Sequence, residues 1–137
     1  MSRVQLLAAD CPLPSADYRS LRTKAALGVS LTMEMGFQVS ALSFCKSAVE
    51  ASADIRRLAM KPCRYELSIE EDAEDLAHFR AYLRENCPPG GEIQLWALRL
   101  GEETRRPPRF RGCLEEFDLE TLRQFLEAEE ICLTVTV

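Results

Sequence analysis

Alternation of apolar and polar residues is clearest in the second half of the chain, where it predicts four strands. Residues 63–69 and 131–137 carry apolar side chains at every second position, which is typical of strands with one buried face. Residues 92–100 are apolar on both faces, so we expect a central strand that is covered on both sides. Residues 109–114 are short and follow two prolines, which favours a strand at the edge of a sheet.

Two segments of this half have helical spacing instead. Residues 73–87 carry an apolar stripe, and Ser68 and Glu71 before it have the spacing of a capping box. The run Pro-Pro-Gly-Gly at residues 88–91 ends this predicted helix. A second helix is predicted to begin after Asp118, a residue type that accepts hydrogen bonds from the first free amides of a helix.

The first half is more ambiguous. Residues 3–9 predict a strand, and residues 15–25 predict a short helix with Ser15 as its N-cap. Alternation over residues 27–35 favours a strand over a helix, and residues 37–45 predict a second strand, with a tight hairpin at Met35–Gly36 between them. Residues 46–60 have helical spacing and end at a proline.

The order of these elements predicts an α+β fold. Residues 63–137 read strand, helix, strand, strand, helix, strand, which is the order of the ferredoxin-like split βαβ arrangement with both helices on one face of the sheet. The N-terminal hairpin and helix are either a degenerate copy of this unit or an extension of the same sheet. With 137 residues, we expect one compact domain, with 1–61 and 62–137 as its two candidate halves.

Charge and cysteine content narrow the classes of function. The chain has 17 basic and 22 acidic residues, a net charge of −5, which makes nucleic acid an improbable partner and leaves a protein partner, self-association or an anionic small molecule. The six cysteines show no metal-ligand spacing, and no signal peptide precedes Met1, so we expect reduced cysteines and a cytoplasmic protein. No apolar run approaches the ~18 residues of a membrane span, so no membrane association is expected.

The sequence offers little that points to catalysis. It has one histidine, His78, and none of the common nucleotide-binding or nucleophile motifs, so we expect no catalytic, cofactor or metal site and hypothesise that the protein is not an enzyme. The acidic run at residues 70–75 suits the first turn of a helix, with a basic protein partner as the other interpretation. Cys11, in a loop, is the best candidate for a reactive thiol, because a helix C-terminus raises the pKa of a thiol such as Cys87.

Two sets of residues remain as candidate binding surfaces. Trp96 and Leu98 share one face of the predicted central strand and would form an interface if the N-terminal half left that face open. The only basic cluster could hold an anionic group, and it consists of Arg105, Arg106, Arg109 and Arg111. We therefore hypothesise a small acidic regulatory or protein-interaction module, monomeric or dimeric. The alternative is an anion-binding domain or minor enzyme with a site between the two halves that uses the 105–111 arginine loop.

Overall fold

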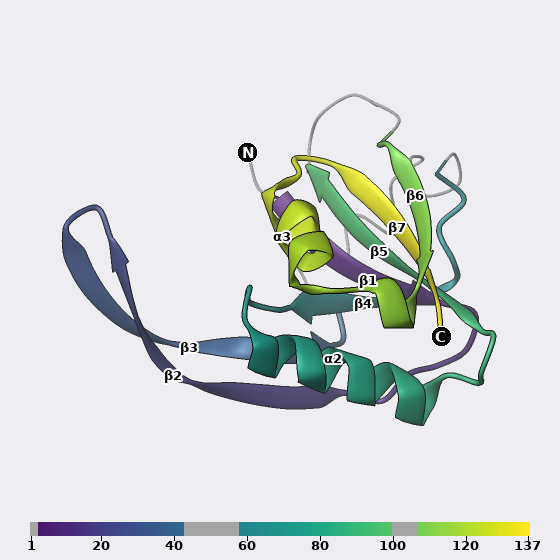
Figure 1. The fold of residues 1–137 in the computed structure, drawn as a ribbon, viewed down its shortest axis with the longest axis horizontal. Helices are drawn as coiled ribbons and strands as arrows, with labels where there is room; N and C mark the ends of the chain where they lie inside the picture. The colour runs from purple at the N-terminus through teal and green to yellow at the C-terminus, as the bar shows by residue number, and fades with distance from the viewer. Residues whose placement is uncertain (1–2, 43–57, 100–106) are drawn as a thin grey trace.

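The computed structural model describes residues 3–42, 58–99 and 107–137. Within these ranges the chain forms seven strands and two α-helices, with a short 3-10 turn before the second helix (Figure 1). The strands are β1 (Arg3–Ala9), β2 (Ala16–Ala26), β3 (Val29–Ser40), β4 (Cys63–Ser68), β5 (Glu92–Arg99), β6 (Arg109–Cys113) and β7 (Ile131–Thr136). The helices are α2 (Ala73–Asn86), η2 (Leu114–Glu116) and α3 (Leu119–Glu127).

All seven strands belong to one sheet in the order β2-β3-β4-β1-β5-β7-β6. The N-terminal strand β1 lies at its centre, antiparallel to both β4 and β5. Residues of the two predicted halves are therefore interleaved in a single sheet, and the N-terminal strands extend that sheet. The edges are β2 and β6, and β6 is the edge strand that its two preceding prolines predict.

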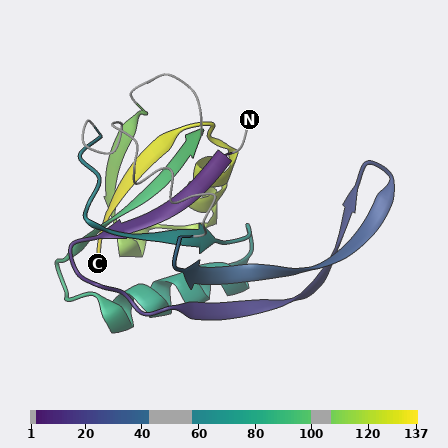
Figure 2. The ribbon, with the colours of Figure 1, turned by 180° about the vertical axis from the view of Figure 1, so that it is seen from behind.

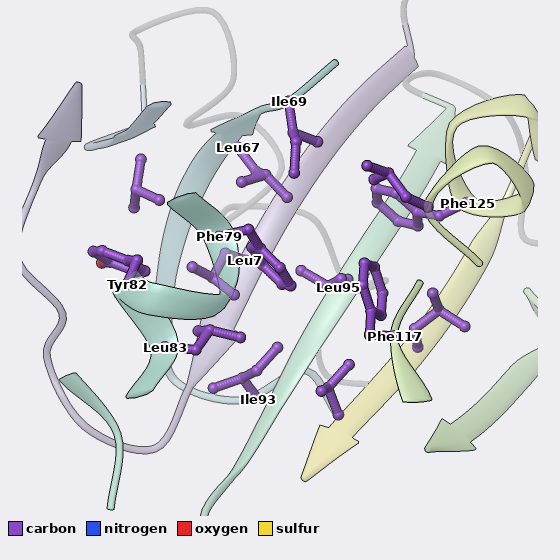
Figure 3. Packing of buried hydrophobic residues seen from close by; sticks show 14 of the residues in the cluster. Leu7, Leu67, Ile69, Phe79, Tyr82, Leu83, Ile93, Leu95, Phe117 and Phe125 are labelled. Carbon is purple, nitrogen blue, oxygen red and sulfur yellow. The ribbon is translucent and has the colours of Figure 1, made fainter. Parts of the chain in front are cut away.

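Helices α2 and α3 cover the same face of the sheet, and the main core lies between them and the strands (Figure 3). Phe79 and Leu83 of α2 and Phe125 of α3 are fully buried there against Leu7 of β1 and Leu95 of β5. Each helix begins as capping chemistry requires, since Asp72 and Asp118 accept hydrogen bonds from the amides three residues later. The Asp118 cap confirms the sequence prediction.

The opposite face of the sheet carries a second core, around Trp96. This indole is fully buried, and Leu98 next to it is 8% exposed. The cluster consists of Val4, Leu6, Ala8, Leu58, Met60, Trp96, Leu98 and Cys132. Apolar side chains on both faces of β5 are thus explained by burial on both sides, as predicted for a central strand.

The mixed α+β class is confirmed, but the ferredoxin-like arrangement is not. The unit β4–α2–β5 is a split βαβ in which β1, from the other end of the chain, lies between the two strands. The unit β6–α3–β7 pairs its two strands directly and in parallel. The order of elements predicted for residues 63–137 is correct, whereas the pairing depends on β1, whose place in the sheet no local pattern encodes.

Three local predictions are wrong. Residues 15–25 form strand β2 and not a helix, because they pair along their whole length with β3. The hairpin turns at Leu27–Gly28 and not at Met35–Gly36, so β3 runs straight through Gly36. Helix α2 is capped by Asp72, so the predicted Ser68–Glu71 capping box does not form. The helix predicted at residues 46–60 lies, except for its last three residues, outside the described residues.

Candidate functional site

The hairpin formed by β2 and β3 extends far from the rest of the molecule (Figures 1 and 2). Its strands pair from Ala16–Val39 to Ala26–Val29, whereas β4 pairs with only Gln38, Val39 and Ser40 of β3. We call the part beyond this pairing, residues 18–37, the arm. A two-stranded hairpin is marginally stable in water by itself, so the exposed arm requires an explanation.

The turn at the tip of the arm is unusual for its sequence. Leu27 and Gly28 both have positive φ, 53° and 76°, which is the geometry of a type I′ hairpin turn. Asparagine or glycine is favoured at the first of these positions, because a Cβ atom crowds the backbone in the left-handed region. Leu27 is also fully exposed, at 103% of its reference area. The tip therefore presents an apolar side chain in a conformation that leucine adopts at a cost.

On one face of the arm, strand β3 carries an apolar stripe. Side chains of alternate residues in a strand lie on the same face, so Val29, Leu31 and Met33 share a face with Phe37, which is buried in the main core. Arg22 and Lys24 of β2 lie opposite Met33 and Leu31 on this face. We call Val29, Leu31 and Met33 the stripe, and their exposures are 55%, 50% and 47%. The other face is mostly polar and includes Thr23 and Thr32, whose hydroxyls lie 3.1 Å apart across the hairpin.

An ion-pair cluster at the start of α2, which we call the clamp, fixes the direction of the arm. Arg22 of β2 donates to the carboxylate of Asp72 and, through Nη2 at 2.9 Å, to Oδ1 of Asp75. Asp75 is fully buried and also accepts the Glu70 amide at 2.7 Å. Both carboxylates raise the pKa of the Arg22 guanidinium, with Asp75 having the larger effect. The clamp thus ties the middle of the arm to the helix layer.

Two further contacts support the base of the arm. The Tyr18 ring stacks on His78 of α2, with centroids 4.2 Å apart and planes inclined by 14°. Gly36 has φ of 143°, and a Cβ at this position would lie 3.0 Å from the Tyr18 carbonyl oxygen and 3.2 Å from Nη2 of Arg22. Glycine is therefore required where β3 passes close to β2 and the clamp.

The arm leaves a strand edge open beside a groove. Among the described residues, β3 from Val29 to Phe37 has no strand partner on the side away from β2, because β4 ends its pairing at Ser68 opposite Gln38. A groove of about 610 Å³ lies where this free edge begins. It is lined by Arg3, Gln5, Lys24, Gln38, residues 66–71 and Leu126. An added strand would have both backbone partners and space there.

The structure buries the predicted interface residues. Trp96 and Leu98 lie in the second core, and the guanidinium of Arg109 sits 5.0 Å from the centre of the Trp96 ring. Neither apolar side chain is available at the surface of the chain. The sequence pattern correctly marks them as apolar on a second face, but it cannot show that Leu58 and Met60 pack against them.

The predicted anion site is only partly described. Arg109 contacts Trp96 and donates to the carbonyl oxygen of Leu58, and Arg111 forms an ion pair of 2.9 Å with Glu92. Arg105 and Arg106 lie outside the described residues. A pocket of about 220 Å³ lies between β6, β7 and α3, and its floor is mostly apolar. The two described arginines thus already have partners within the chain.

The remaining candidates have structural roles. In the acidic run, Asp72 caps α2 and Asp75 holds Arg22. Cys11 is exposed. The pKa of the Cys87 thiol is raised, as expected, but the main cause is burial and not the predicted effect of the helix C-terminus. Among the five cysteines in the described ranges none forms a disulfide. Over the same ranges no cluster of metal-ligating side chains is found.

Comparisons with known proteins suggest no function for the chain, so functional inference depends mainly on the arm. Searches against protein-family profiles, curated protein sequences and solved structures give no significant match. None of the helices in the described part of the chain has the length and apolar character needed to cross a membrane. Sequence analysis missed the arm because alternation in residues 27–35 predicts a strand but does not show which face is covered. The one signal for the arm in the sequence was the position of Leu27 before Gly28, at the turn of the hairpin.

Proposed function

We propose that the protein is a non-enzymatic interaction module that binds a protein partner through its arm. The observation that carries the proposal is the stripe, which continues the buried core outward as a row of half-exposed apolar side chains. Monomeric proteins rarely present such a row unless it is an interaction surface. The fully exposed Leu27 at the tip extends the row by one more apolar residue.

The free edge of β3 determines how a partner would bind. An unpaired strand offers a row of amide and carbonyl groups that another strand can satisfy, and apolar side chains beside it then add affinity. Covering the exposed half of each stripe residue contributes roughly 1 kcal/mol per side chain, and covering Leu27 contributes roughly 2 kcal/mol. This is enough to support a specific contact together with the backbone hydrogen bonds.

The clamp supports the proposal that the arm is presented to a partner in a fixed orientation. Arg22 holds the arm at its midpoint, so the distal strands project at a set angle and do not fold back on the sheet. A preformed strand edge binds with a smaller loss of conformational entropy than a flexible segment does. The partner would meet a surface that is already ordered.

Site-specific photo-crosslinking in cells of the native source tests this function. A photoreactive phenylalanine analogue replaces Leu31 on the stripe, or Leu119 on α3, which is a leucine of similar exposure (39%) away from the arm. We expect a protein adduct at position 31 that is absent at position 119. The adduct should be lost when Val29 and Met33 are both replaced by threonine. Equal adduct yields at positions 31 and 119 would contradict the proposal.

A further inference from the structure

The free edge of β3 has the properties of a self-complementary surface. A strand can pair antiparallel with a second copy of itself about a two-fold axis, and the same residues then serve both partners. Between Val29 and Met35 the strand carries one charged side chain, Glu34, which lies opposite Ser30 when the two-fold axis is at Thr32, so no like charges face each other at such a contact. In the part of the chain that the structure describes, this edge lacks a neighbour from Val29 to Phe37.

The other edge of the arm is unsuited to the same contact. Strand β2 is also an outer edge of the sheet, but it carries Arg19, Arg22 and Lys24. A two-fold pairing of β2 with itself would place these basic residues against one another, and like charges that face each other across strands are destabilising. The charge distribution therefore selects β3 as the contact edge and β2 as the protected one.

The position of Ser68 limits the register of the pairing. Ser68 of β4 occupies the position beside Gln38, so an added strand can pair with β3 only up to Phe37. A two-fold axis at Thr32 satisfies this limit, because Val29 then lies opposite Met35 of the second copy and Leu31 opposite Met33. The paired segment, residues 29–35, is about 23 Å long at 3.3 Å per residue. The tip with Leu27 reaches the groove beside Ser68.

Charge in the groove does not oppose this occupant. Arg19 and Arg22 of the arm are already paired with Asp17 and with Asp72 and Asp75. The groove is lined by both basic and acidic side chains, namely Arg3, Lys24, Glu66, Glu70 and Glu71. Residues 25–31, around the tip, carry no charged side chain, so no like charges meet where the tip of one copy reaches the groove of the other.

We infer that the partner of the arm is a second copy of this chain, joined by antiparallel pairing of β3 with β3 about a two-fold axis at Thr32. This inference rests on the proposed function of the arm. It produces a four-stranded ribbon in the order β2-β3-β3-β2, with the two stripes side by side on one face. Each tip then occupies the groove of the other copy.

Light scattering and two matched cysteine substitutions test the inference. Thr32 and Thr23 lie directly opposite each other in the hairpin, so Thr32→Cys and Thr23→Cys, both made with Cys11→Ser, place a thiol at the same height on β3 or on β2. We expect a dimer by mass, and a disulfide-linked dimer that is several-fold more abundant for Thr32→Cys than for Thr23→Cys. Circular dichroism of each variant verifies that the fold is kept.

The outcomes separate the inference from the proposed function. A dimer that cross-links through Thr23→Cys, or a monomer at all concentrations, overturns pairing through β3. If a monomer still gives an arm-specific adduct with another protein at position 31, the arm binds by strand addition and only the second copy is wrong. A monomer without an arm-specific adduct contradicts both.

Discussion

Removal of the Arg22 side chain tests whether the clamp holds the arm. Replacement by methionine keeps the aliphatic part of the side chain and deletes the guanidinium. Asp75, which is fully buried, then keeps only the Glu70 amide as a hydrogen-bond donor to its carboxylate. The perturbation thus leaves a buried charge without its counter-ion.

The expected loss in the free energy of unfolding lies near the lower end of the range known for buried ion pairs. Stripping one partner from a buried ion pair typically costs 3–5 kcal/mol, and Arg22 is itself 21% exposed, so we expect a loss of about 3 kcal/mol. Domains of this size are stable by roughly 5–15 kcal/mol, so the loss is readily measured. The double variant with Asp75→Asn should lose less than the sum of the single variants, by about 2 kcal/mol, because no buried charge then remains.

Urea unfolding followed by circular dichroism measures these free energies. The matched control is Arg19→Met, since Arg19 lies on the same strand and pairs with the exposed Asp17 at 2.8 Å. Exposed pairs contribute little to stability, so this variant should unfold almost as the parent does. If Arg22→Met costs no more than Arg19→Met, or if its effect is unchanged in the Asp75→Asn background, the clamp does not hold the arm.

Three further predictions concern the tip, the close approach at Gly36 and a helix cap. Leu27→Asn should raise the free energy of unfolding by roughly 1 kcal/mol, because asparagine tolerates positive φ, and should weaken the arm-specific adduct; a stability gain with an unchanged adduct would show that the leucine has no binding role. Gly36→Ala should lower stability by roughly 1–3 kcal/mol, and an unchanged urea midpoint would refute the close approach at this position. Hydrogen bonds from the amide and hydroxyl of Thr121 hold the pKa of Asp118 below its usual value, so its contribution is present above about pH 4 and is lost as the pH falls through the lowered pKa. Asp118→Ala should therefore be less stable than the parent at pH 7, and urea titrations should show the difference shrinking in acid; a constant difference would contradict this.

Local signals identified most of the elements in the second half of the chain. The alternation of residues 131–137, the N-cap Asp118 and the doubly apolar β5 each have a cause that acts within a few residues. The location of β1 between β4 and β5 depends on pairings across about 60 and 90 residues, and no periodic pattern reports such distances. The α+β class was therefore predictable, whereas the strand order was not.

The candidate site was harder to find for a related reason. Arg22 and Asp75 are ordinary charged residues in the sequence, and only the fold brings them within 2.9 Å. Gly36 suggested a turn, but it lies within β3, where its positive φ lets β3 pass close to β2. Trp96 was singled out because a second apolar face suggested an interface, and burial against Leu58 and Met60 removed that role. Exposure, which distinguishes the stripe from a core strand, is a property of the whole fold.

The most direct test of the arm as a binding element is the adduct yield at position 31 relative to position 119 in living cells. We predict an adduct at position 31 alone, its loss when Val29 and Met33 become threonine, and an adduct mass of twice the chain if the partner is a second copy. Equal yields at the two positions, or an adduct that survives the loss of the stripe, would contradict the claim that the arm binds a partner.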